Sequence, residues 1–120
     1  MSFGIKITPA DRVFSLQIRS RDHWTCRRCE KVYVYPTNAL QCAHMFSRRC
    51  SRCTAKRPRG QASPEHECTR LDPDNALALC AGCHTYLDSN PWEKEAFWRS
   101  EIGDERFDAL AARAHGKRDR

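Results

Sequence analysis

The sequence lacks any long apolar run. No segment approaches the roughly 20 consecutive apolar residues that a membrane-spanning helix needs. The stretch from Met1 to Ala10 has neither the apolar core nor the small-residue cleavage site of a signal peptide. We therefore expect no membrane partner and a cytoplasmic location. In that reducing compartment, paired cysteines are more often metal ligands than disulfides.

Apolar residues are also scarce overall. Hydrophobic residues make up 40% of the 120 positions, and the mean hydropathy is −0.76. A chain of this length forms one domain, here residues 1–120. Its small hydrophobic core needs additional cross-links, such as disulfides or bound metal. Eight cysteines can supply them. The net charge of +6 suits a polyanionic partner such as nucleic acid.

Capping signals and residue patterning predict a small α+β chain. Thr8-Pro9 with Asp11 three residues after the threonine is a helix start. A cap, a proline and a carboxylate recur at 90–93. The expected elements are a helix over 8–22, two strands over 32–35 and 39–45 joined by a turn at 36–38, a strand over 76–79, and helices over 90–114. Three tryptophans, Trp24, Trp92 and Trp98, are expected in the core.

Two Cys-x2-Cys motifs flank the middle of the chain. Zinc takes four thiolate or imidazole ligands in a tetrahedron, and two such knuckles can supply them from distant points of the sequence. We therefore expect a structural zinc on Cys26, Cys29, Cys80 and Cys83. A thiol redox protein is the alternative, but no βαβ pattern surrounds either motif.

A third knuckle lies in a basic, proline-containing segment at 47–70. Its residues Cys50 and Cys53, with His66 and Cys68 behind them, form the ligand set of a second expected zinc. Cys42 competes with His66 for the fourth position, and unligated surface thiols are the other interpretation. The basic residues expected to contact DNA phosphates are Arg48, Arg49, Arg52, Lys56, Arg57, Arg59 and Arg70.

Between and after the knuckles come His44, Asn75 and His84, in that order. This order, framed by two knuckles, resembles the HNH (ββα-metal) endonucleases. The resemblance implies a zinc-stapled ββα core over 26–88, in which His44 is the general base, Asn75 fixes the loop that orients it, and His84 binds a catalytic Mg²⁺ or Mn²⁺. DNA would be the substrate. Taken one at a time, each of these residues is more simply a polar or turn residue.

The match extends to one group within that family. The knuckles, Ala43-His44, the run from Asn75 to Cys80 and the stretch 97–110 are similar to the phage NinG (Rap) recombination proteins. That resemblance implies recombination or branched DNA in a phage or prophage context, and hence the host cytoplasm. Two coordinated cuts at a junction would favour a homodimer. The insert 50–68 departs from the pattern.

One departure concerns the metal. Many HNH enzymes have a carboxylate immediately before the first His, where this chain has Ala43. Asp88 lies four residues after His84 on the same helical face and could supply an oxygen ligand, or it could be a solvated residue at a helix end. The missing carboxylate keeps a second hypothesis open: a non-catalytic zinc-stapled DNA-binding or assembly module.

Overall fold

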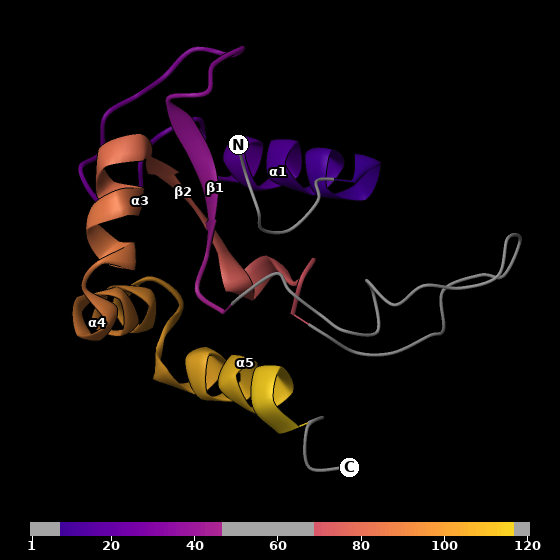
Figure 1. Ribbon diagram of the computed structural model, residues 1–120, viewed down its shortest axis with the longest axis vertical. Helices are drawn as coiled ribbons and strands as arrows, with labels where there is room; N and C mark the ends of the chain where they lie inside the picture. Colours follow the sequence, from indigo (N-terminus) through magenta and orange to yellow (C-terminus); the bar gives the residue numbers. More distant parts are fainter. Residues whose placement is uncertain (1–7, 47–68, 117–120) are drawn as a thin grey trace, which may run out of the picture.

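The computed structural model describes residues 8–46 and 69–116. Within these ranges the chain is a small α+β protein with a two-stranded sheet between helices (Figure 1). The elements, in chain order, are α1 (Pro9–Arg21), β1 (Leu40–His44), the short 3-10 turn η1 (Pro73–Asn75), β2 (Ala76–Cys80), α3 (Ala81–Asp88), α4 (Pro91–Ile102) and α5 (Asp104–Gly116).

Helix α1 begins where the sequence places its capping signals. Asp11 N–H donates to Thr8 Oγ1 at 3.1 Å, and Thr8 N–H donates back to the Asp11 carboxylate at 2.9 Å. This reciprocal box satisfies two backbone N–H groups that the first turn leaves open. Phe14 and Ile18, one turn apart, are buried against the sheet together with Ala76.

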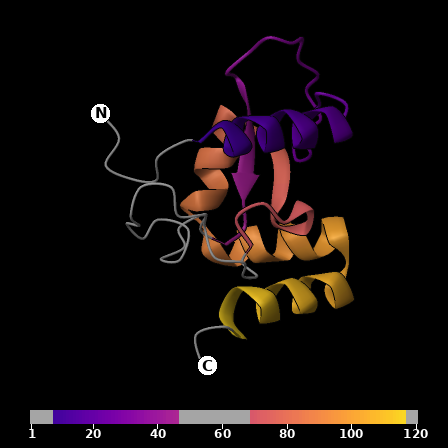
Figure 2. The same cartoon turned by 90° about the vertical axis from the view of Figure 1, so that its right-hand side faces the viewer.

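The sheet pairs β1 and β2 in antiparallel register, from Leu40 opposite Cys80 to His44 opposite Ala76. Helix α1 covers one face and α3 covers the other, as both views show (Figures 1 and 2). The outer edge of β2 is covered: Ala78 N–H donates to Asp22 Oδ2 at 2.9 Å, and Ala78 O accepts from Arg27 N–H. The outer edge of β1 faces a cleft instead.

The expected strand over 32–35 is absent. Only Val32 forms an isolated bridge, with Thr25, and Val32 and Val34 are 67% and 82% exposed. The strand that pairs with β1 is β2, about 35 residues further along. Two adjacent β-prone runs with a turn between them favour a hairpin, but here the first run bonds back to the chain just before it, with Cys26 N–H donating to Lys31 O and Tyr33 N–H donating to Trp24 O.

The C-terminal helices support the turn that precedes β2. Trp98 on α4 is fully buried and donates its Nε1–H to Asp74 O at 3.0 Å. From α5, Arg106 pairs with Asp74, and Arg113 pairs with Asp72 at 2.8 Å. These contacts fix η1, which carries Asn75.

Two expectations about α4 are wrong. Trp92, on the first turn of α4, is 86% exposed rather than part of the core, whereas Trp98, six residues later, is fully buried. Asn90 occupies the N-cap position but makes no side-chain cap, since its amide donates to Tyr86 O instead. Among the described helices, none has the length and apolar character needed to cross a membrane.

Candidate functional site

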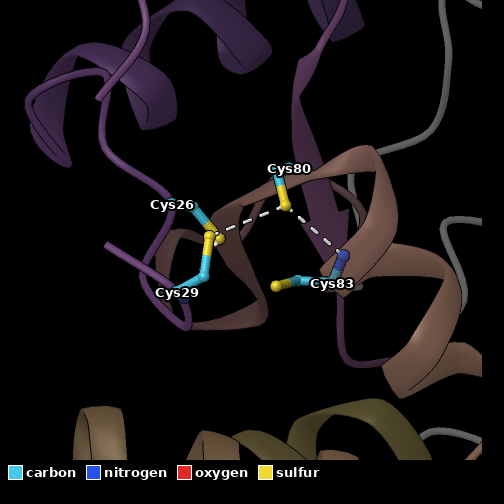
Figure 3. A group of neighbouring side chains, drawn as sticks. All are labelled: Cys26, Cys29, Cys80 and Cys83. Carbon is cyan, nitrogen blue, oxygen red and sulfur yellow. Dashed lines mark hydrogen bonds between the residues drawn. The ribbon is translucent and has the colours of Figure 1, made fainter. Parts of the chain in front are cut away.

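The two outer knuckles meet in space. Cys26 and Cys29 follow α1, while Cys80 ends β2 and Cys83 lies in the first turn of α3 (Figure 3). All four Sγ atoms lie within 4.8 Å of one another. Cys26 and Cys83 are buried, whereas Cys29 is exposed. The cluster therefore joins the segment after α1 to the junction between β2 and α3, which lies about 50 residues further along the chain.

The spacing of the sulfurs suits a tetrahedral metal. Cys29 Sγ and Cys80 Sγ are 3.8 Å apart. A disulfide requires about 2.05 Å, whereas two thiolates about 2.3 Å from one tetrahedral zinc are about 3.8 Å apart. These four residues could hold a metal ion. The second set, Cys50, Cys53, His66 and Cys68, lies outside the described residues.

Hydrogen-bond donors favour the thiolate form of Cys80, whereas burial raises the pKa of the Cys83 thiol to about 12. Cys83 N–H points at Cys80 Sγ at 3.4 Å, as drawn in Figure 3, and Cys29 N–H points at Cys26 Sγ at 3.5 Å. Burial alone would raise the pKa of the Cys80 thiol, but the donors from Cys83 and the neighbouring thiols bring it down to about 7. Arg28 Nη1 lies 3.4 Å from Cys83 Sγ and offsets negative charge there.

A cleft of about 1020 Å³ runs along the outer edge of β1. Its walls come from α1, the segment 35–38, β1, and the facing ends of α3 and α4. Arg19 connects two of the walls: its Nη1 donates to Thr37 O at 3.1 Å and to Leu40 O at 3.3 Å. The polar residues that line the cleft include Arg12, Gln41, His44, His84, Asp88 and Lys94. Two of the three residues that the sequence singled out, His44 and His84, thus share one cleft.

His44 is the last residue of β1, on the face covered by α1. Its ring centroid lies 6.0 Å from that of Phe14, and its Nε2 is buried. Asn75 does not line the cleft. Its fully buried side chain accepts from Phe46 N–H at 2.8 Å and donates to Phe46 O at 3.0 Å and Thr69 O at 2.9 Å. Asn75 therefore fixes the chain immediately after His44 to the chain just before η1.

His84 approaches the cleft from α3. Its Nδ1 donates to Gln41 Oε1 at 2.7 Å, so the neutral ring carries its lone pair on Nε2. That Nε2 faces Asp88 Oδ2 at 3.3 Å. Burial lowers the pKa of His84, and the nearby Lys94 ammonium acts in the same direction, while Asp88 opposes them. The imidazole is thus mainly neutral near pH 7, which is its ligand form.

Gln41 is a site residue that sequence reasoning missed. It lies two positions before Ala43, and alternate residues of a strand share a face. The side chain next to His84 therefore comes from position 41, whereas Ala43 is fully buried in the apolar cluster beneath. The alternation along β1 could have pointed to it.

Arg70 corrects one expectation. It is 8% exposed, and its Nη2 lies 2.6 Å from Asp11 Oδ2. Burial alone would raise the pKa of Asp11, but hydrogen bonds from Thr8 and Arg70 hold it below its usual value. Arg70 thus connects the chain before η1 to α1, and it is not placed to contact DNA phosphates. The other six basic residues of the insert, Arg48, Arg49, Arg52, Lys56, Arg57 and Arg59, lie outside the described residues.

Comparison with family models decides the family. A model described as HNH endonuclease matches residues 19–92, more than half of the chain. The chain belongs to the HNH endonuclease family. The matched range contains both outer knuckles, β1, η1, β2 and α3, and so all three residues of the His-Asn-His order. Membership of the HNH family indicates nuclease activity with DNA as the substrate. Comparisons with curated proteins and with solved structures give no match.

Proposed function

We propose that this HNH protein is a metal-dependent DNA endonuclease that hydrolyses phosphodiester bonds in the β1 cleft. The observation that carries the proposal is the sharing of one cleft by His44, His84 and Asp88, inside the matched HNH range. A base and a pair of metal ligands reach the edge of β1 from opposite faces of the sheet. A phosphodiester at that edge would lie between them.

The catalytic cation would be held by His84 and Asp88. Two ligands at right angles, each about 2.1 Å from a metal, are about 3.0 Å apart, and the 3.3 Å between His84 Nε2 and Asp88 Oδ2 is close to this. The lone pair of His84 Nε2 and the Asp88 carboxylate oxygen repel each other unless a proton or a metal cation lies between these two atoms. Since burial disfavours the protonated ring, this pair suits Mg²⁺ or Mn²⁺. When bound, such an ion stabilises negative charge on the phosphate and the leaving 3′ oxygen.

His44 would act as the general base. Its imidazole lines the cleft, and a neutral imidazole can take a proton from a water near pH 7. Asn75 would be a positioning residue, because its three hydrogen bonds fix the backbone just after His44. Gln41 would likewise position His84, because its oxygen keeps the proton on Nδ1 and leaves Nε2 for the metal.

The four-cysteine cluster would hold a structural zinc, and the insert would hold a second one on Cys50, Cys53, Cys68 and either His66 or Cys42. The branched-DNA substrate, the phage setting in a host cytoplasm, and the homodimer are finer parts of the proposal. They rest on the NinG resemblance of the sequence.

Two observations favour a second function, a non-catalytic DNA-binding module. Ala43 supplies no oxygen, and Asp88 is already paired with Lys94 at 2.7 Å. The separating experiment is cleavage of supercoiled plasmid and of a four-way junction with Mg²⁺ or Mn²⁺. Metal-dependent nicking that is lost in His44→Asn supports the nuclease. Tight DNA binding with no cleavage under any tested metal supports the module.

A further inference from the structure

Lys94 places a fixed positive charge inside the cleft. Its Nζ lies 2.7 Å from Asp88 Oδ1 and 5.9 Å from the centre of the Trp98 ring, and its side chain is only 14% exposed. Because its stem is packed and α4 is rigidly joined to the core through Trp98, this is not a freely moving surface lysine.

The Asp88 carboxylate is therefore shared. One oxygen faces His84 Nε2 and the other binds the Lys94 ammonium. The single negative charge of Asp88 is balanced by Lys94, and Ala43 adds no carboxylate to the site. A divalent cation that enters between His84 and Asp88 must overcome this ammonium.

We propose that Lys94 is a positioning residue that competes with the divalent cation for Asp88. On metal binding, its ammonium is released toward a DNA phosphate in the same cleft. This inference rests on the proposed nuclease function. Lysine binds phosphate as a compact point charge, and Lys94 lines the cleft in which the phosphodiester would lie.

The consequence is a coupling between metal and DNA. In the DNA-free protein, the ammonium weakens metal binding. Once a phosphate is present, it offers the displaced ammonium a new anionic partner, so DNA should strengthen metal binding. By linkage, the metal then strengthens DNA binding by the same factor.

The first experiment measures Mn²⁺ binding by the zinc-loaded protein without DNA, using the electron paramagnetic resonance signal of free Mn²⁺. Lys94→Met keeps the apolar stem and removes the charge. A monovalent and a divalent cation about 5 Å apart in water repel enough to change an affinity roughly tenfold at low salt. We therefore expect Lys94→Met to bind Mn²⁺ about tenfold more tightly than wild type.

Three variants sharpen this measurement. Lys94→Arg keeps the charge and should stay within about threefold of wild type. Lys31→Met removes an exposed lysine that does not line the cleft and should leave Mn²⁺ binding unchanged. Lys94→Gln is a second neutral variant, for use if the methionine variant proves poorly folded. Unchanged or weaker Mn²⁺ binding in a folded neutral variant overturns the competition, as does a Lys94→Arg variant that binds like Lys94→Met.

The second experiment tests the release. DNA binding is measured against salt in a His44→Asn background, with and without saturating Mn²⁺. Each phosphate contact contributes about 0.9 to the slope of log affinity against log salt. Lys94→Met should lower the slope by about one unit with Mn²⁺ and by nothing without it. A loss in both conditions, or in neither, overturns the release. If the wild-type protein never cleaves DNA, the nuclease proposal fails, whereas the Mn²⁺ measurement still decides the competition.

Discussion

We predict that removal of the proposed zinc from the four-cysteine cluster unfolds the domain. Cys26 is fully buried, and Cys80 joins the end of β2 to the start of α3, so the cluster fixes two chain segments about 50 residues apart to the same point. Structural zinc in small modules has apparent binding free energies of ~10 kcal/mol or more at pH 7. Folded domains of ordinary size are stable by only about 5–15 kcal/mol in total. A zinc ion bound at this cluster would therefore contribute a free energy comparable with the whole stability of a domain of this size.

The perturbation is Cys80→Ser in the purified protein. Serine cannot replace the thiolate, and it also loses the sulfur that accepts from Cys83 N–H. At roughly 3–5 °C per kcal/mol for a chain of this size, a loss of ~10 kcal/mol moves the melting temperature by more than 30 °C. We expect a largely unfolded protein at 25 °C by circular dichroism. A strong chelator added to wild type should have the same effect.

Cys42→Ser is the control for loss of the first zinc, because Cys42 lies on β1 and outside the four-cysteine cluster; if Cys42 is the fourth ligand of the second zinc, only that zinc should be lost. The Cys42→Ser variant should melt within a few degrees of wild type. Metal analysis completes the test, with zinc released from the first site in proportion to unfolding. A Cys80→Ser variant that melts with wild type and keeps its full zinc content would refute the reasoning, as would disulfides among these cysteines under reducing conditions.

Three further predictions concern the insert and the cleft. Cys53→Ser should remove one of two zinc ions per chain without unfolding the domain, by metal analysis and circular dichroism; a total of one zinc in wild type contradicts the second site. Four arginines of the insert are neutralised together: Arg48, Arg49, Arg57 and Arg59. This should lower the slope of log DNA affinity against log salt by roughly three to four units, and an unchanged slope would show that the DNA binds elsewhere. Ala43→Asp buries a carboxylate in an apolar cluster, so without Mn²⁺ the zinc-loaded variant should melt at a lower temperature than zinc-loaded wild type, and added Mn²⁺ should raise its melting temperature more. Equal Mn²⁺ shifts in the two proteins would exclude position 43 as a ligand position.

Local signals in the sequence anticipated the parts of the fold that depend on neighbouring residues. The capping box at Thr8 and Asp11 needs only four consecutive residues, and the knuckle geometry needs only the spacing of its cysteines. The order His44, Asn75, His84 carried the family, which the comparison confirms at the level of HNH endonucleases. The NinG assignment stays a prediction.

Contacts between segments that are far apart in the sequence could not be predicted from the sequence. The strand prediction at 32–35 was wrong because β-propensity cannot say which run pairs with β1. Arg70 looked like one more cation of a basic stretch, but Asp11, 59 residues earlier, holds it in the interior. Lys94 approaches Asp88 across the turn between α3 and α4, and no helical periodicity connects those two positions.

The most direct measurement of the central claim compares plasmid cleavage by His44→Asn and wild type, each zinc-loaded, in saturating Mn²⁺. His23→Asn is the matched control: His23 is exposed and its backbone is left-handed, with φ of 58°, a conformation that asparagine tolerates. Loss of a general base typically costs ~10²–10⁴ in rate. We predict that loss for His44→Asn, with DNA binding and melting temperature close to wild type, and full activity for His23→Asn. Wild-type cleavage by a folded His44→Asn protein would contradict the proposed site.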